Sequence, residues 1–154
     1  MDGKPHASAL RRGRYSEPGR IYLVTSVTTG RRPVFAEFAA ARVLVRALRR
    51  EQELERAKTL AFVVMPDHLH WLLNLGEGQS LCAVVRAVKA VTAHELGRAI
   101  WQAGFHDHAL RREEDLAAVA RYVVANPVRA RLVQRVGDYP HWDAVWLQLP
   151  PERL

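Results

Sequence analysis

The chain has 154 residues, with 23 Lys and Arg against 16 Asp and Glu, which gives a formal net charge of +7. This length forms one ordinary domain with a single core, and a hydrophobic content of 49% excludes a disordered chain. The one cysteine, Cys82, cannot close an intramolecular disulfide, and no apolar run approaches the roughly 18–20 residues that cross a bilayer. Because the N-terminus also lacks an apolar signal core, we expect a soluble protein of the cytoplasm.

The distribution of positive charge is more informative than its total. An excess of this size favours a polyanionic partner, with nucleic acid first and an anionic membrane surface second. Thirteen of the 23 Lys and Arg residues lie in 1–58 and ten lie in 86–153, whereas 59–85 contains none. We therefore expect this middle segment to be core, or a site that relies on groups other than Lys and Arg.

One domain at 20–147 is expected between a basic N-terminal arm at 1–19 and a C-terminal tail at 148–154. Hydrophobic periodicity, capping residues and the positions of Pro and Gly define its elements. In chain order we predict a strand at 21–28, a helix at 36–57, strands at 59–64 and 68–75, a helix at 81–99, a short strand at 105–111 and a helix at 113–125. The solvent-facing side of the first helix carries Arg42, Arg46, Arg49, Arg50 and Arg56.

The order of these elements predicts the fold class. A β-α-β-β-α-β core is the ferredoxin-like arrangement, an α+β fold in which helices cover one face of an antiparallel sheet. The other face of the sheet is then open for a ligand.

Two histidines, His68 and His70, are separated by one residue in the strand predicted at 68–75. Because side chains alternate along a strand, both imidazoles point to the same face. Such a pair can bind a divalent metal ion, since neutral imidazole is a common ligand. The alternative is a pair of ordinary strand histidines that form hydrogen bonds, because two ligands underdetermine a metal site.

Tyr122 and Asn126 lie four residues apart near the end of the last predicted helix, and therefore on one side of it. Tyr122 flanks the apolar stripe of that helix. The side chain is either a half-buried packing residue or a nucleophile that faces a site across the sheet. Asn126 before Pro127 is most simply a pair that ends the helix.

A second polar group, His106, Asp107 and His108, falls in the short strand predicted at 105–111. His106 and His108 would share a face, so a metal site, a polar surface and a DNA contact are all open there. Arg111 and Arg129 flank the last helix and can bind phosphates as charge-assisted forks, although solvated surface arginines are equally consistent with the pattern.

Taken together, these segments resemble the REP-associated tyrosine transposases, which belong to the HUH single-tyrosine transposase and nuclease superfamily. The similarity runs from about Arg14 to Trp146. Its signature blocks are VVMPDHLHWLL at 63–73, WQAGFHDHALR at 101–111 and ARYVVANPVRARLV at 120–133, preceded by YLVTSVTTGRRPVF at 22–35. Each block alone is modest evidence, but their order and spacing together are highly specific.

The resemblance implies an RRM-like form of the ferredoxin-like fold and a role for each matched residue. His68, His70 and Asn126 would bind a divalent metal, Mg or Mn, and Tyr122 would be the nucleophile. The partners would be single-stranded DNA and DNA hairpins, with no membrane and no obligate protein partner. Residues expected to contact DNA are Arg14, Arg31, Arg32, Arg86, Lys89, His106, Asp107, His108, Arg111 and Arg129.

The resemblance implies a metal-dependent single-stranded DNA endonuclease and strand transferase that forms a 5′-phosphotyrosine intermediate at REP-type hairpins. The alternative is a domesticated protein that binds the same hairpins without cleaving them. A third possibility, an RNA-binding sheet domain, rests on fold analogy alone.

Overall fold

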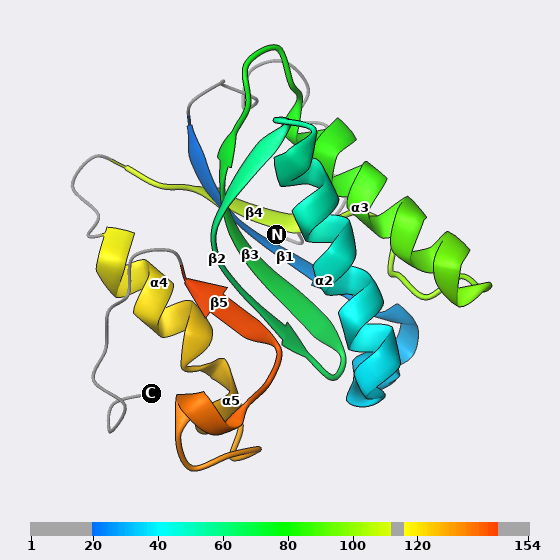
Figure 1. The fold of residues 1–154 in the computed structure, drawn as a ribbon, viewed down its shortest axis with the longest axis vertical. Helices are drawn as coiled ribbons and strands as arrows, with labels where there is room; N and C mark the ends of the chain where they lie inside the picture. The colour runs from blue at the N-terminus through cyan, green and yellow to red at the C-terminus, as the bar shows by residue number, and fades with distance from the viewer. Residues whose placement is uncertain (1–19, 112–115, 145–154) are drawn as a thin grey trace.

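Five antiparallel strands form one sheet in the order β4-β1-β3-β2-β5 (Figure 1). The computed structural model describes residues 20–111 and 116–144, so the predicted arm, with Arg14, and the predicted tail lie outside the described residues. The strands are β1 (Ile21–Val27), β2 (Ala57–Met65), β3 (His68–Leu75), β4 (His106–Ala109) and β5 (Trp142–Ala144). The helices are α2 (Phe38–Glu53), α3 (Leu81–Leu96), α4 (Leu116–Val124) and α5 (Asn126–Arg129), with short 3₁₀ turns at Thr29–Arg31, Val34–Ala36 and Val136–Asp138.

The predicted fold class is confirmed. Strands β4, β1, β3 and β2 with helices α2 and α3 make the ferredoxin-like α+β core. The sequence analysis missed β5, a three-residue strand that extends the β2 edge of the sheet. So short a strand carries too few residues for an alternation pattern to be recognised.

The predicted helix at 36–57 ends earlier than expected. Helix α2 stops at Glu53, because Glu55 has a positive φ of 58° and Ala57 already begins β2. Gly76, after β3, lies against this turn, where an added Cβ would come 2.5 Å from the carbonyl oxygen of Glu55. Helix α3 begins where expected, since the Ser80 side chain accepts a hydrogen bond from the Ala83 amide at 3.0 Å.

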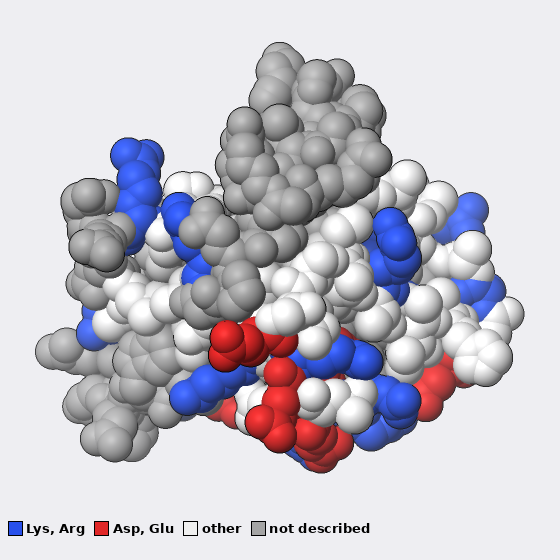
Figure 2. Space-filling view, turned by 90° about the horizontal axis from the view of Figure 1, so that it is seen from above, with Lys and Arg blue, Asp and Glu red and all other residues white. Residues whose placement is uncertain are grey.

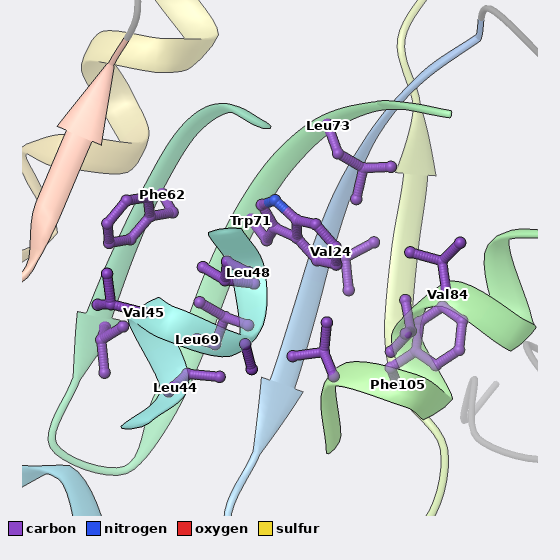
Figure 3. Close-up of a cluster of buried hydrophobic side chains, with 14 of the residues drawn as sticks. Val24, Leu44, Val45, Leu48, Phe62, Leu69, Trp71, Leu73, Val84 and Phe105 are labelled. Atoms are coloured by element: carbon purple, nitrogen blue, oxygen red, sulfur yellow. The ribbon is translucent and has the colours of Figure 1, made fainter. Parts of the chain in front are cut away.

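The larger core lies between the sheet and the two helices α2 and α3, which cover one face (Figure 1). Figure 3 shows Leu44, Val45 and Leu48 of α2 directed toward the sheet. From β3, Leu69, Trp71 and Leu73 contribute to the same cluster, and Trp71 is completely buried. Because side chains alternate along β3, His68 and His70 point to the other face of the sheet.

Helix α4 covers the other face on the β2 side, which the sequence analysis expected to be open. Ala120 and Val124 of α4 pack against Ala61 of β2 and Leu72 of β3 in a second buried cluster. Among the described residues, no helix covers this face over β1 and β4 (Figure 1). No described helix has the length and apolarity of a membrane span.

His141, just before β5, lies at the edge of the sheet between two aromatic rings. Its ring centroid is 5.1 Å from that of Phe38 and 5.7 Å from that of Tyr139. The side chain is buried, and Nδ1 has no hydrogen-bond partner among the described residues. Burial, aided by the charge of Arg42, lowers the pKa of His141 below its ordinary value.

We predict that His141 makes the fold less stable in mild acid. The unfolded chain takes up the proton below about pH 6.5 while the folded chain resists it, so stability falls as the pH drops from 7 to 5, by at most about 1.4 kcal/mol per pH unit for one group. His141→Phe should reduce this slope in urea unfolding. Tyr139→Phe is the control, because its hydroxyl donates to the Val64 carbonyl and its pKa is raised to about 12, so this change should lower stability equally at both pH values. An unchanged slope in His141→Phe would contradict the assignment.

Candidate active site

His68 and His70 lie on the face of β3 that is turned away from α2 and α3. Pairing with β1 places Val27 opposite His68 and Thr25 opposite His70. The two imidazole rings meet edge to face with their centroids 4.8 Å apart. The predicted common face of the pair is therefore confirmed, and the rings are close enough for both to reach one bound ion.

The Nδ1 atom of each imidazole has a hydrogen-bond partner. His68 Nδ1 lies 2.7 Å from Asp67 Oδ1, and His70 Nδ1 lies 2.9 Å from Thr25 Oγ1. A carboxylate can only accept, so Nδ1 of His68 is the donor, and in the neutral form of the ring Nε2 keeps a free lone pair. Where Thr25 accepts in the same way, both Nε2 atoms are ready to bind a metal ion, as metal-ligating histidines usually are.

Asp67 is held in place by the turn that joins β2 to β3. Its backbone carbonyl accepts from both the amide and the hydroxyl of Thr28, each at 3.0 Å. Its other carboxylate oxygen, Oδ2, accepts from Arg31 Nε at 3.1 Å. Burial disfavours the ionised carboxylate, but the hydrogen bond and charge of His68 and the charge of Arg31 outweigh this effect, so the pKa of Asp67 is lowered.

The pKa of His70 is lowered to about 4, first by burial and then by the charges of His68 and Arg129. At neutral pH this ring is uncharged, which is the form that binds metals. The site therefore offers a neutral imidazole without a deprotonation step.

Tyr122 lies on α4, which packs on the same face of the sheet as the histidine pair. Its side chain is 62% exposed, so the half-buried packing role considered from the sequence is wrong. Instead, the Arg129 guanidinium lies over the phenol ring, with its carbon 3.7 Å from the ring centroid. The same guanidinium depresses the pKa of His70, so Arg129 is close to both the tyrosine and the histidine pair.

Helix α4 ends at Val124, just before the Asn126–Pro127 pair, as the simplest expectation for Asn before Pro has it. After a single residue, Ala125, the chain continues into α5, and the amide of Ala130 donates to the Asn126 carbonyl. Pro127 has no N–H for the carbonyl of Val123, and Asn126 Nδ2 donates to that carbonyl at 3.2 Å instead. The amide nitrogen is thereby occupied, which leaves Oδ1 as the atom that could bind a metal ion.

The structure places His106 and His108 on the same face as the histidine pair. His106 pairs with Thr25 across the β1–β4 ladder, and Thr25 in turn contacts His70. Both histidines of β4 are exposed, whereas Asp107 between them is half-buried. They lie two strand spacings from β3, about 10 Å, so they extend the polar surface of this face and do not join the first pair. Arg111 is exposed two residues after β4.

The remaining predicted DNA contacts are divided between two regions. Arg31 is at the site through Asp67, and Arg32 is exposed beside it. Arg86 and Lys89 are on α3, in the other layer, where they line a cavity of about 400 Å³. The Lys89 ammonium donates to the carbonyls of Gln102 and Gly104 at 2.9 and 2.6 Å, which gives it a structural role and argues against the predicted phosphate contact.

Thr25 and Asp67 are the site residues that sequence reasoning missed. For Asp67, its position directly before His68 was a usable signal in the sequence. Thr25 carried no signal in the sequence, because only the register of β1 on β3 brings it to His70.

The donor set fits a small divalent ion. Within 20–111 and 116–144, no three His, Cys, Asp or Glu side chains gather into a metal-binding group. A metal site built on the two imidazoles therefore needs a further donor of another kind. The Oδ1 atom of Asn126 is chemically suited to this role, because amide oxygens bind Mg and Mn. The ligand set that the motifs implied, His68, His70 and Asn126, stays a prediction.

Comparison with known proteins gives consistent results. Residues 20–126 match the family described as "Transposase IS200 like". The REP-associated tyrosine transposase of Escherichia coli K12 is 35% identical over 82 residues, covering 52% of this chain and 50% of that protein. A second curated protein, from Haemophilus influenzae, is 29% identical over 100 residues, covering 54% of this chain and 57% of its own length. The chain thus spans little more than half the length of these relatives.

Among solved structures, that of a REP-associated tyrosine transposase bound to a REP hairpin superposes with a TM-score of 0.74. The two chains are 28% identical, and the match covers 84% of this chain and 79% of the other. The resemblance to REP-associated tyrosine transposases is therefore confirmed in sequence and in fold. Because the family match extends over more than half of the chain and includes both histidines, Tyr122 and Asn126, this protein belongs to the IS200-like transposase family.

Proposed function

We propose that this chain is a metal-dependent endonuclease and strand transferase that acts on single-stranded DNA beside REP-type hairpins. The observation that carries the proposal is the common face of His68, His70 and the Tyr122 helix, with Arg129 close to both. The related structure described as bound to a REP hairpin supports the choice of substrate.

The proposed metal ion is Mg or Mn, with His68, His70 and Asn126 as its ligands. When bound, the ion would polarise the scissile phosphate and offset the negative charge that develops on it. Asp67 and Thr25 hold the two imidazoles in fixed orientations, so the ligands need little reorganisation.

Tyr122 is the proposed nucleophile. A phenol is protonated at neutral pH, so its hydroxyl first has to give its proton to a nearby base or to water. The oxygen then attacks phosphorus and the bond from phosphorus to the 3′ oxygen breaks, which leaves a 5′-phosphotyrosine link and a free 3′ hydroxyl. The reverse attack by that hydroxyl, or by one from another strand, rejoins DNA without an external energy source.

Positively charged side chains around the site would hold the substrate. Arg31, Arg32, Arg111 and Arg129 are exposed and lie at the site, beside it or at the end of β4. Arginine binds phosphate as a planar fork, so Arg129 is positioned to hold both the tyrosine ring and the phosphate that it attacks.

We predict that Tyr122→Phe abolishes a covalent protein–DNA adduct. Wild-type protein incubated with Mn and a labelled REP-type hairpin with single-stranded flanks should give an adduct that survives denaturing electrophoresis. Tyr139→Phe is the matched control, because its phenol is hydrogen-bonded to the Val64 carbonyl and is not proposed to react. Normal adduct yield in Tyr122→Phe would exclude this nucleophile, whereas tight hairpin binding without any adduct in wild type would favour the domesticated DNA-binding protein.

The metal site is predicted to depend on both histidines. His68→Ala and His70→Ala should each weaken Mn²⁺ binding in calorimetry by at least about tenfold, since each removes one of three ligands. His94→Ala, on the exposed end of α3 in the other layer, should leave binding unchanged. Equal affinities in all three variants would rule out the proposed site.

Asp67 is predicted to set the tautomer of His68. In Asp67→Ala the imidazole loses its acceptor at Nδ1, so ¹⁵N NMR should show a mixture of ring tautomers in place of a single one. Mn²⁺ affinity should fall by about 10- to 100-fold, as for other partners that orient metal-binding histidines. Asp138→Asn, which alters a surface pair with Arg135, is the control. A single unchanged tautomer in Asp67→Ala would show that the carboxylate does not orient the ring.

A further inference from the structure

We propose that helix α2 and the β5 edge bind a second stretch of single-stranded DNA, outside the catalytic site. We call this surface the edge track and define it by Phe38, Arg42, Arg46, Arg49 and Arg50. The inference rests on the proposed function only in that the substrate has a single-stranded segment next to its hairpin. The function derived above makes no use of these residues.

Four arginines form a continuous stripe along the outer side of α2. At 100° per residue they fall within an arc of about 100°, and the rise from Arg42 to Arg50 is about 12 Å. Arg46, Arg49 and Arg50 are exposed and Arg42 is half-buried. None of the four forms an ion pair with any residue in the described ranges, although Glu51 in the same helix is bonded to Arg56. The stripe therefore presents four cations that no close ion pair holds, although Asp143 lies at the same hollow as Arg42 and Arg49.

An exposed aromatic side chain stands at the start of this stripe. Phe38 is 63% exposed, one turn before Arg42. Its inner side contacts the ring of His141, which in turn contacts Tyr139. Tyr139 packs with Val63 and other residues on the face that carries the histidine pair. A row of three rings thus leads around the β5 edge from the layer of the proposed active site to the arginine stripe.

A hollow beside the stripe provides room for a nucleotide. It has a volume of about 190 Å³ and is lined by Arg42, Arg49, Gln52, Thr59, Trp142 and Asp143, among others. Gln52 Oε1 accepts from the Thr59 amide and Thr59 Oγ1 accepts from Trp71 Nε1, which leaves the Gln52 amide nitrogen and the Thr59 hydroxyl proton to bond to sugar or base edges. The two guanidinium groups can hold phosphates.

The choice of single-stranded DNA follows from this combination of groups. Bases inside a duplex are stacked on both sides and offer no free face to Phe38, whereas an unpaired base does. A cationic groove with an aromatic platform is the usual way in which proteins bind single strands without sequence preference.

Total charge alone would not have located this surface. Figure 2 shows acidic side chains in the lower part of the view, in more than one group, with Lys and Arg beside and between them. The net charge of +7 is therefore not concentrated in one patch there. The edge track is identified by the spacing of the arginines along α2, by the exposed ring of Phe38 and by the neighbouring hollow.

The test compares three labelled DNAs by fluorescence anisotropy with the full chain: a hairpin alone, and the same hairpin with about ten thymidines on its 5′ or its 3′ side. One tail should increase affinity. Phe38→Ala should reduce that increase in affinity by at least about fivefold and should leave binding of the untailed hairpin unaffected. Arg46→Gln should lower the slope of log affinity against log salt by about 0.7 for the tailed DNA.

Two matched variants control for unspecific effects. Leu54→Ala removes an exposed apolar side chain, 48% exposed, just beyond the other end of α2. Arg98→Gln removes one exposed arginine after α3. Neither change should alter the gain from the tail. The track is overturned if neither tail raises affinity, if the controls weaken tailed DNA as much as the test variants, or if a uridine RNA tail replaces thymidines with equal or greater effect.

The two proposals fail in different ways. Loss of the tail effect with an intact Tyr122 adduct overturns the edge track alone. Absence of the adduct with an intact tail effect overturns the nuclease and leaves the track as a DNA-binding surface.

Discussion

The pairing of β1 with β3 is the constraint on which the site depends. Because side chains alternate along a strand, a shift of one residue would exchange the two faces of β3. His68 and His70 would then enter the apolar core, and Leu69 and Trp71 would lie on the polar face. Burial of Trp71 against α2 and α3 therefore selects the register, and the register delivers Thr25 to His70. The apolar core on one face of the sheet therefore determines where the polar site lies on the other face.

A proline gives the second half of the site its form. An uninterrupted helix would use the amide of residue 127 to bond the Val123 carbonyl, and Asn126 would have no fixed partner. With Pro127 in that position, the Asn126 side chain takes over the hydrogen bond, and its oxygen is left over. The chain remains helical on both sides, so Arg129 falls two turns after Tyr122 and lies over its ring. The missing N–H of Pro127 therefore determines the positions of both the Asn126 side chain, a proposed metal ligand, and the Arg129 guanidinium.

Positive charge is distributed in a way that suits a metal-assisted reaction on DNA. The segment without Lys or Arg, 59–85, forms β2 and β3 and carries the histidine pair at the centre of the sheet. Lysine or arginine in this position would repel a divalent ion, whereas neutral imidazoles attract it. The arginines lie instead on the 29–32 turn and on α5, beside the site, and along α2 on the opposite face of the sheet, where they can bind phosphates without competing with the proposed metal. The Lys and Arg residues behind the net charge of +7 thus surround a central segment that contains none of them, as the proposed function requires.

The sequence by itself determined the order and class of the elements and the common face of His68 and His70, because these depend on local periodicity alone. It also marked Tyr122 and Asn126 as neighbours on one helical side. What it could not determine were contacts between residues far apart in the chain: Thr25 on His70, Arg129 on the Tyr122 ring and close to His70, and the two carbonyls that accept hydrogen bonds from the Lys89 ammonium. Strand β5 and the placement of α4 over β2 likewise arise only when the apolar surfaces of distant segments pack together. Tertiary structure decided these features, because the chemistry of a side chain determines what it can bind, whereas the packing of the whole chain determines which partner it contacts.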